Sequence, residues 1–426
     1  MKKLFTLALL AMVTAASHAQ QTLIHCGNLI DGKNKEILMQ MTIVVEGNKI
    51  VSLNKGFTKP DASSKVIDLS KKTVMPGLID MHVHLESETS KDQLVKRFTL
   101  NEADIAFQST VYAKKTLMAG FTTVRDCGGT GVNISLRNAI NQGIVVGPRV
   151  FTAGKAIATT GGHADPTNGY RKDLMGDPGA KEGVIDGVDD ARKAVRQRYK
   201  DGADFIKITA TGGVLSVAKD GSGPQFTQEE VNAIVETAKD YGMIVAAHAH
   251  GAEGMKRAVL AGVTTIEHGT LMTDEVMGLM IQKGTYQVPT IIAGKSAAEY
   301  AKIPGYYPAV VVPKALAIGS KIQDNFGKAY KRGVKIAFGT DAGVFPHGEN
   351  AREFGYMVEA GMPAIEALLS AMLSSANIMG MGDKIGSIES GKLADIVAVD
   401  ENPTVNIKTM ENVSFVMKDG VVYKNE

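Results

Sequence analysis

The sequence is poor in residues that would mark several classes of protein. Among its 426 residues there are only two cysteines, Cys26 and Cys127. Two thiols in a chain of this length do not form a disulfide framework. A single bridge is the alternative, but the two positions fall in different predicted domains. We therefore expect both thiols to stay free.

The chain also lacks an excess of charge of either sign. Lysine and arginine together number 47 against 45 acidic residues, so the net charge is +2. A protein that binds nucleic acid is expected to carry a basic excess or patch. The composition therefore gives no reason to expect a nucleic-acid partner, and its 44% hydrophobic and 22% charged residues are typical of a globular chain.

Long hydrophobic runs are missing after the first residues. Two lysines precede an apolar run from Leu4 to Val13, and small residues follow up to Ala19. This is the layout of a secretory signal peptide over residues 1–19, cleaved near Ala19-Gln20. The run is shorter than the ~20 residues of a spanning helix, with an uncleaved anchor as the alternative. We expect a secreted, soluble protein with no membrane contact after cleavage, periplasmic in a Gram-negative host.

Both ends of the mature chain are rich in predicted strands. Short β-branched or alternating segments, separated by turn residues, fill residues 20–76 and return in residues 383–426. Asp419-Gly420, for example, is a hairpin signal. Two β-rich ends around a different central part predict one small β-sandwich domain built from both chain ends.

The central part, residues 77–382, alternates between strand-like and helical segments. Eight strands are expected, over residues 77–84, 122–125, 149–153, 205–209, 244–247, 264–267, 285–290 and 335–339. Among the helices, 228–241 has a capping-box start at Thr227 and Glu230, and the last before the eighth strand is expected over 314–332. The alternation predicts an α/β fold, a (β/α)8 barrel of the TIM type. A doubly wound open sheet is the alternative, but no dinucleotide-binding glycine fingerprint follows any strand.

Imidazole and carboxylate side chains lie at the ends of the predicted barrel strands, where the chemistry of such barrels takes place. Strands one, five, six and eight end with His82, His84, His248, His250, His268 and Asp341. His82 and His84 are two residues apart and therefore share one face of their strand. One such histidine alone would be a hydrogen-bonded core residue. The whole set on one rim predicts a site for zinc or a similar transition metal.

Lys207 is unusual because it lies on the fourth strand among apolar neighbours. An ammonium beside metal-binding histidines would be repelled and poorly solvated. The lysine could lose its proton, as Schiff-base lysines do. It could instead react with CO2 to form a carbamate, an anionic ligand for two metals, or it could reach solvent. The surrounding metal ligands favour the carbamate.

At these residues the sequence resembles the amidohydrolase superfamily. Residues 74–84 are similar to its strand-one signature, and Phe205-Ile206-Lys207 is similar to the carboxylated-lysine motif of its binuclear subtype. His248, His268 and Asp341 match the remaining ligand positions. The resemblance covers residues 20–426. It implies two divalent metal ions, zinc first among them, held by His82, His84, Lys207 carbamate, His248, His268 and Asp341.

Within the superfamily the sequence resembles the group of Xaa-Pro dipeptidases (prolidase-like) and carboxypeptidases, which is often labelled imidazolonepropionase-related. The likeness lies in residues 159–163, 209–214, 246–251 and 265–270. It implies that His163, the backbone of Val214 and His250 hold the C-terminal part of a peptide. Some relatives have tyrosine where this chain has His250, a departure that bears on the side-chain preference.

The resemblance implies hydrolysis of an amide C–N bond by a metal-bridged hydroxide. Asp341 would take the hydroxide proton and pass it to the leaving amine. We expect a dipeptidase or carboxypeptidase acting on Xaa-Pro-like or other short peptides. Alternatives are an N-acyl amino acid amidase or aromatic amide hydrolase, a cyclic-amide hydrolase or deaminase, and a solute-binding barrel without turnover. The resemblance is also compatible with a homo-oligomer.

Two further groups near the expected rim are interpreted as structural. Arg125 and Asp126 end the second strand, where we expect an ion pair. His347 lies in the loop after the eighth strand; it could line the pocket, but we expect it on the surface.

Overall fold

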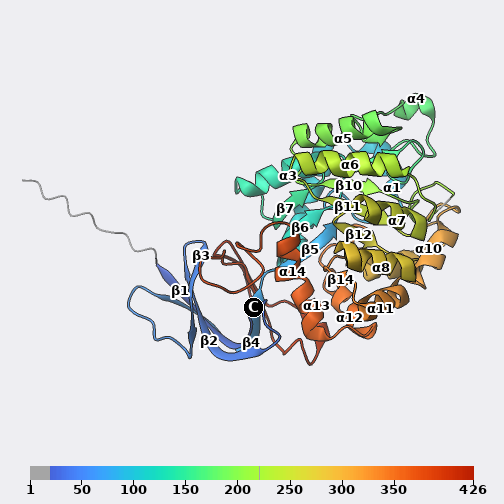
Figure 1. Ribbon diagram of the computed structural model, residues 1–426. Coiled ribbons are helices and arrows are strands. Elements are labelled where there is room, and N and C mark those ends of the chain that lie inside the picture. The colour runs from blue at the N-terminus through green and yellow to red at the C-terminus, as the bar shows by residue number, and fades with distance from the viewer. Residues whose placement is uncertain (1–19, 220) are drawn as a thin grey trace, which may run out of the picture.

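The computed structural model describes residues 20–219 and 221–426 (Figure 1). The expected signal peptide, residues 1–19, lies outside the described residues. Within the described part of the chain, no helix is both long and apolar enough to cross a membrane. Cys26 and Cys127 are both buried and free.

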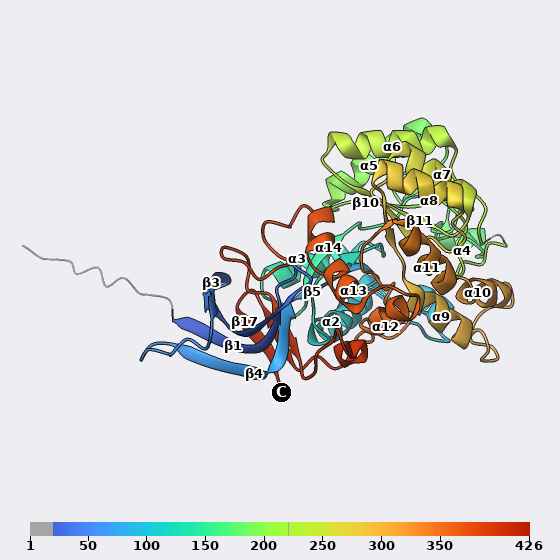
Figure 2. The same ribbon diagram turned by 60° about the horizontal axis from the view of Figure 1, so that its bottom comes forward.

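Strands from both chain ends form one mixed sheet at one end of the molecule (Figures 1 and 2). Its seven strands are, in spatial order, β17 (Val421–Asn425), β16 (Phe415–Lys418), β15 (Ile396–Val399), β4 (Lys65–Pro76), β1 (Gln21–Ile30), β2 (Ile37–Glu46) and β3 (Lys49–Lys55). Where two sheets of a sandwich were expected, the strands form a single continuous sheet. The reason is the long β4, which pairs in parallel with β1 and, near its end, antiparallel with β15.

Three further sheets are parallel throughout, a two-stranded one in the long loop after β7 and two larger ones. The three-stranded one contains β5 (Leu78–Val83), β6 (Phe121–Asp126) and β7 (Arg149–Thr152), and the five-stranded one contains β10 (Ile206–Thr209), β11 (Val245–Ala249), β12 (Thr265–His268), β13 (Tyr286–Val288) and β14 (Lys335–Ile336). Neighbouring strands in each sheet are also consecutive in sequence and are separated by helices. The architecture is therefore α/β with mixed sheets.

Each of these two larger sheets has an edge strand that forms a single bridge to a segment outside it. Val83 of β5 pairs with Ala342, in the segment after β14, and Ile208 of β10 pairs with Ile157, just before β8 (Ala158–Thr159). The last strand, β14, ends at Ile336 and is shorter than the expected 335–339, and Asp341, further along the chain, has a positive φ of 62°. The parallel strands of the described residues therefore form separate sheets of three, five and two strands, and not the continuous eight-stranded ladder of the expected barrel.

Helices pack around the outside of the parallel strands (Figure 1). They are α1 (Gln93–Thr99), α2 (Glu102–Met118), α3 (Val132–Asn141), α5 (Val188–Asp201), α6 (Gln228–Asp240), α7 (Ala252–Ala261), α8 (Asp274–Lys283), α9 (Ile291–Tyr300), α10 (Val312–Gly319), α11 (Ile322–Arg332), α12 (Arg352–Glu359), α13 (Ala364–Ser370) and α14 (Leu373–Ile378). The capping box of α6 is present as predicted, because Thr227 accepts from the backbone N–H of Glu230 while Glu230 accepts from that of Thr227. The long loop after β7 holds the short β8 (Ala158–Thr159), α4 (Lys172–Met175) and β9 (Val184–Ile185).

The region between β13 and β14 differs from the sequence prediction. The expected helix over 314–332 is two helices, α10 and α11, and an additional helix, α9, precedes them. Helices α9 and α10 approach closely at Gly319, where an added Cβ would lie 2.4 Å from the Cβ of Ala298. These helices form one wall of the cavity described next.

Candidate functional site

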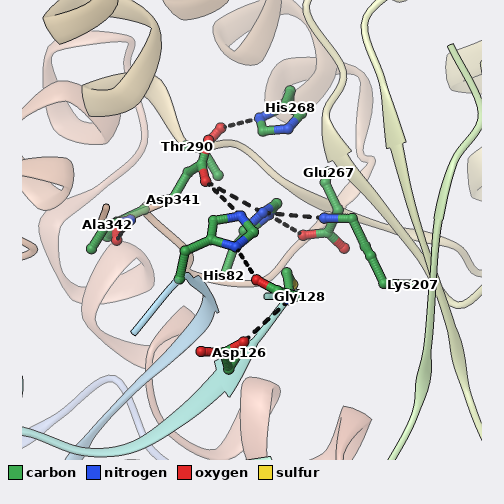
Figure 3. A network of polar contacts seen from close by, with 12 residues as sticks. His82, Asp126, Gly128, Lys207, Glu267, His268, Thr290, Asp341 and Ala342 are labelled. Atoms are coloured by element: carbon green, nitrogen blue, oxygen red, sulfur yellow. Dashed lines mark hydrogen bonds and ion pairs between the residues drawn. The ribbon is translucent and has the colours of Figure 1, made fainter. Parts of the chain in front are cut away.

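His82 and His84, at the end of β5, present the same ring nitrogen to one point in the cavity. Nδ1 of His82 lies 2.8 Å from Oε2 of Glu267, and Nδ1 of His84 lies 2.7 Å from the carbonyl oxygen of Gly128. These partners occupy Nδ1 of both rings. Nε2 of both therefore faces Asp341, whose Oδ1 is 3.5 Å from His82 and 3.2 Å from His84 (Figure 3).

Asp341 is held in place by its backbone. Its N–H donates to the carbonyl oxygen of His82 at 2.6 Å, and its left-handed φ turns the carboxylate toward the two histidines. Burial by itself would raise the pKa of this carboxyl group. The charges and hydrogen bond of His82 and His84 have the larger effect, so the pKa of Asp341 lies below its usual value. Asp341 is therefore an ionised carboxylate that faces the cavity.

Lys207 lies on β10 with its side chain directed at the same point. Its residue is only 4% exposed, and Nζ is 3.2 Å from Nε2 of His82 (Figure 3). The interpretation as a lysine that reaches solvent is therefore wrong, because the side chain points from β10 into the buried interior. The amine stands among the histidines, where a carbamate would be a ligand.

Three more histidines complete the cluster from β11 and β12. Their ring centroids are 4.7 Å apart for His248 and His250, and 4.6 Å for His248 and His268. Nδ1 of His268 lies 2.6 Å from Oγ1 of Thr290, and Nδ1 of His250 lies 2.9 Å from Oγ1 of Thr270. Burial lowers the pKa of all three imidazoles, to about 4 for His250. They are therefore neutral, as metal ligation requires.

The donor atoms suit metal ions. His248, His250 and His268 form one group whose ligand atoms lie within 4.8 Å of one another, and His82, His268 and Asp341 form a second. The two groups share His268, so they adjoin. Neutral imidazoles with one carboxylate are the donors that zinc and similar transition metals prefer. The geometry would also allow His250, which we assigned to substrate, to act as a ligand.

His163 and Val214, the other predicted substrate contacts, lie beside this cluster. The ring of His163 stacks on His248 with centroids 4.4 Å apart, and its buried Nδ1 has no hydrogen-bond partner. Burial lowers the pKa of His163 to about 3, so its ring is neutral. Val214 is 8% exposed and belongs to the cavity wall. An unpartnered buried nitrogen at this place is available to a ligand.

All of the predicted site residues line one cavity of about 660 Å³. Its volume is within the usual range for a small-molecule site. It is continuous from the metal-binding residues to an apolar wall formed by α9, α10 and α11.

The sequence interpretation missed Glu267 and misassigned Arg125. Arg125 is fully buried, and its Nη2 lies 2.6 Å from Oε1 of Glu267. Asp126, the partner expected for it, instead accepts from the backbone N–H of Leu85 and from the side chain of Asn133. Arg125 and Asp126 are neighbours on a strand and so point to opposite faces of it, which prevents their pairing.

The prediction of a surface position for His347 is also wrong. This residue is 4% exposed, its ring stacks on Tyr112, and Nε2 lies 2.9 Å from the carbonyl oxygen of Ser87. The loop after β14 folds back onto α2, so its histidine is enclosed. His347 packs between these elements and does not line the cavity of the metal-binding residues.

Comparison with known proteins agrees with this geometry. A family model described as "Amidohydrolase family" matches residues 73–424. Ochratoxinase of Aspergillus niger is 30% identical over 442 residues, which cover 97% of this chain and 88% of that protein.

Solved structures are similar over nearly the whole chain. A crystal structure of a Xaa-Pro dipeptidase with methionine bound in the active site is 56% identical, has a TM-score of 0.93, and matches 95% of this chain and 100% of that one. A prolidase in complex with N-methylphosphonate-L-proline is 33% identical with a TM-score of 0.86, over 95% of this chain and 100% of that one.

Proposed function

The chain belongs to the amidohydrolase family of hydrolases acting on amide and peptide bonds, and on this premise we propose that it is a metal-dependent dipeptidase or carboxypeptidase that releases the C-terminal residue of short peptides. One observation carries the proposal: two adjoining groups of metal donors share His268, and one of them includes the ionised carboxylate of Asp341. Further support comes from two similar structures, a Xaa-Pro dipeptidase with methionine in its active site and a prolidase with a proline phosphonate.

We propose that the residues of this site hold two divalent ions, with zinc favoured by the donor types. The ligands would be His82, His84, His248, His268, Asp341 and Lys207. Bound ions would supply Lewis-acid activation of a water molecule and of the amide carbonyl. Lys207 would bind them as a carbamate, formed when its amine adds to CO2 and loses a proton. That reaction turns a buried cation into an anion.

The chain's own residues orient the groups and move the proton. Glu267 and the carbonyl of Gly128 fix the rings of His82 and His84 through Nδ1. Asp341 accepts the proton of the attacking water on Oδ1 and then donates it to the leaving nitrogen. His163, through its unpartnered Nδ1, and His250 bind the C-terminal carboxylate together with the backbone of Val214.

We further propose that the two larger parallel sheets act together as a (β/α)8 barrel. Supporting this, Val83 of β5 bridges to Ala342 after β14, Ile208 of β10 bridges to Ile157 before β8, and the candidate ligands come from β5, β10, β11, β12 and the segment after β14. We also propose export under the direction of residues 1–19. Fractionation of the host with an antibody to the protein tests this, and detection in the cytoplasm alone would contradict it.

A second candidate is hydrolysis of N-acylated amino acids or aromatic amides. The observation in its favour is the similarity to ochratoxinase over 97% of the chain. N-acylated amino acids also carry an amide and a carboxylate, so the same residues would serve for them. The two candidates differ in the acyl group on the scissile nitrogen, which is an aminoacyl group in a dipeptide and a different acyl group in an N-acylated amino acid.

The test is a panel of dipeptides, N-acyl amino acids and cyclic amides, incubated with zinc-loaded protein and read with ninhydrin. We expect release of free amino acids from dipeptides. We also expect loss of activity after chelation and its return with zinc. Unchanged rates in metal-free protein, verified by elemental analysis, would overturn the metal-dependent proposal, and turnover of cyclic amides alone would overturn the peptidase proposal.

A further inference from the structure

Beyond the candidate metal ligands, the cavity opens into an apolar chamber. We infer that this chamber, defined by Val214, Ala293, Ala297, Ala315, Ile318 and Val344, receives the side chain of the substrate's C-terminal residue. The enzyme would then select peptides that end in an uncharged, apolar residue such as leucine, methionine or phenylalanine. The inference rests on the proposed function and specifies its substrate class.

None of the six residues that define the chamber has a polar side chain. Ala293 and Ala297 come from α9, and Ala315 and Ile318 come from α10; all are buried and all line the cavity. Small side chains on α9 and α10 leave room between the helices and the metal-binding residues. A charged substrate side chain placed here would lose its hydration and find no partner.

The charged side chain of Lys314, on α10, does not provide the chamber with a partner for a charged substrate. Lys314 immediately precedes Ala315, but its Nζ donates to the carbonyl oxygens of Gly213, Ser216 and Ala218 at 3.0, 2.6 and 2.7 Å. Its charge is therefore engaged in holding the loop that carries Val214. This loop supplies both a wall of the chamber and the backbone proposed to bind the substrate carboxylate.

Three connections place the leaving residue next to the chamber. The backbone of Val214 is a proposed contact of the C-terminal part of the peptide, and its side chain packs with Ala297 and Ala315. Asp341, the proposed proton donor to the leaving nitrogen, precedes the wall residue Val344 by one turn, and the N–H of Val344 donates to its carbonyl at 3.1 Å. Thr290, the N-cap of α9, contacts His268. The residue released by hydrolysis thus lies between the metal donors and α9.

The first experiment compares dipeptides Ala-Xaa that differ only in the C-terminal residue. A hydrophobic pocket distinguishes side chains by about 10-fold or more per methylene-sized difference. We therefore expect kcat/KM for Ala-Leu, Ala-Met and Ala-Phe to exceed that for Ala-Ala by ~10-fold or more. Ala-Lys and Ala-Asp should fall ~100-fold or more below Ala-Leu, because a site without partners rejects a charged group. Equal rates for Ala-Leu, Ala-Lys and Ala-Asp would overturn the inference.

Two variants change the chamber in opposite directions. Ala297→Leu fills it and should lower the ratio of kcat/KM for Ala-Phe over Ala-Ala by ~10-fold. Ile318→Ala enlarges it and should raise that ratio. Ala317→Leu is the matched control, since Ala317 is exposed on the same helix and should leave the ratio at the wild-type value. Ratios that do not change in either chamber variant, with melting temperatures close to wild type, would overturn the inference.

Failure of the proposed function would look different. In that case no dipeptide is cleaved by the zinc-loaded protein, whatever its last residue. Calorimetric titration with free L-leucine and L-lysine then tests the side-chain preference of the chamber independently of turnover. Binding of leucine that Ala297→Leu weakens supports the inference, and equal binding of both amino acids, or of neither, overturns it.

Discussion

Glu267 accepts a hydrogen bond from Nδ1 of His82 at 2.8 Å, with both side chains buried (Figure 3). The other carboxylate oxygen of Glu267 lies 2.6 Å from the guanidinium of Arg125. Burial opposes ionisation of Glu267, but the charge of Arg125 and the hydrogen bond with His82 outweigh it and lower the pKa of Glu267 well below its usual range. A buried anion therefore fixes the orientation of His82 and makes its free nitrogen a better donor.

Replacing this anion should weaken metal binding. Glu267→Gln is expected to reduce zinc affinity by ~10–100-fold, the usual effect of losing the partner of a metal-binding histidine. The variant also leaves Arg125 buried without its counter-ion, which should destabilise the protein by ~3–5 kcal/mol. Competition with a chromophoric chelator measures the affinity. Glu230→Gln, which removes the buried capping carboxylate of α6, is the control, and equal zinc affinity in both variants would refute the role of Glu267.

The proposed carbamate on Lys207 predicts a chemical rescue. Lys207→Ala should lose activity because the anionic ligand is gone, and acetate or propionate should restore part of it by occupying the vacated space. Lys207→Arg keeps the positive charge but cannot form a carbamate and fills that space, so it should be inactive with or without the acids. The measurement is kcat/KM against acid concentration. Full activity of Lys207→Ala without added acid would show that the lysine is not a ligand.

Asp341 should affect turnover more than folding. Asp341→Asn is expected to lower kcat by ~10²–10⁴-fold, as loss of a general acid–base group does. Asparagine tolerates the left-handed conformation that this position adopts at φ 62°. The melting temperature should therefore stay near that of wild type. Elemental analysis measures the metal content of the variant and so distinguishes loss of the proton carrier from loss of a metal ion. An unchanged kcat in the metal-loaded variant would rule out the proton-transfer role.

Glu353 makes the stability of the fold depend on pH. It is fully buried, and its two oxygens accept from the backbone N–H groups of Ile291 and Ile292 at the start of α9. Burial raises the pKa of Glu353 to about 8. In the unfolded chain a glutamate has a pKa of about 4.3. The folded state therefore binds the proton more tightly, and this contribution to stability is complete below about pH 4.3 and is lost as the pH rises toward 8.

The variant Glu353→Gln removes this proton. It should be less stable at low pH, because the amide cannot accept both backbone hydrogen bonds. Between about pH 5 and pH 8 its melting temperature should fall less than that of wild type. Differential scanning calorimetry at several pH values measures the difference between the two proteins. Parallel melting curves across this interval would show that Glu353 does not titrate as expected.

Local sequence patterns were sufficient for much of the site. The two-residue spacing of His82 and His84 places them on one strand face, and that face is indeed turned toward Asp341. The start of α6 at Thr227 was readable because a capping box involves residues only three apart. The family resemblance then connected histidines on different strands, which spacing alone could not do.

The partners of buried charges were decided by the tertiary structure. Nothing in the sequence near Arg125 indicates that its partner is Glu267, which is far along the chain and meets it only because β6 and β12 face each other across the interior. The same holds for His347, which is enclosed only when its loop packs on α2. Such pairings depend on distances between strands, which no periodicity records.

The sequence by itself determined the α/β alternation, the candidate metal ligands and the family. Periodicity, caps and spacing are properties of neighbouring residues, and a ligand set at strand ends follows from them once the strands are assigned. The tertiary structure alone decided the break of the strand ladder before Asp341, the split of α10 from α11, and the apolar chamber under α9. Those features depend on how segments that are distant in sequence pack against one another, and periodicity, caps and spacing do not record that packing.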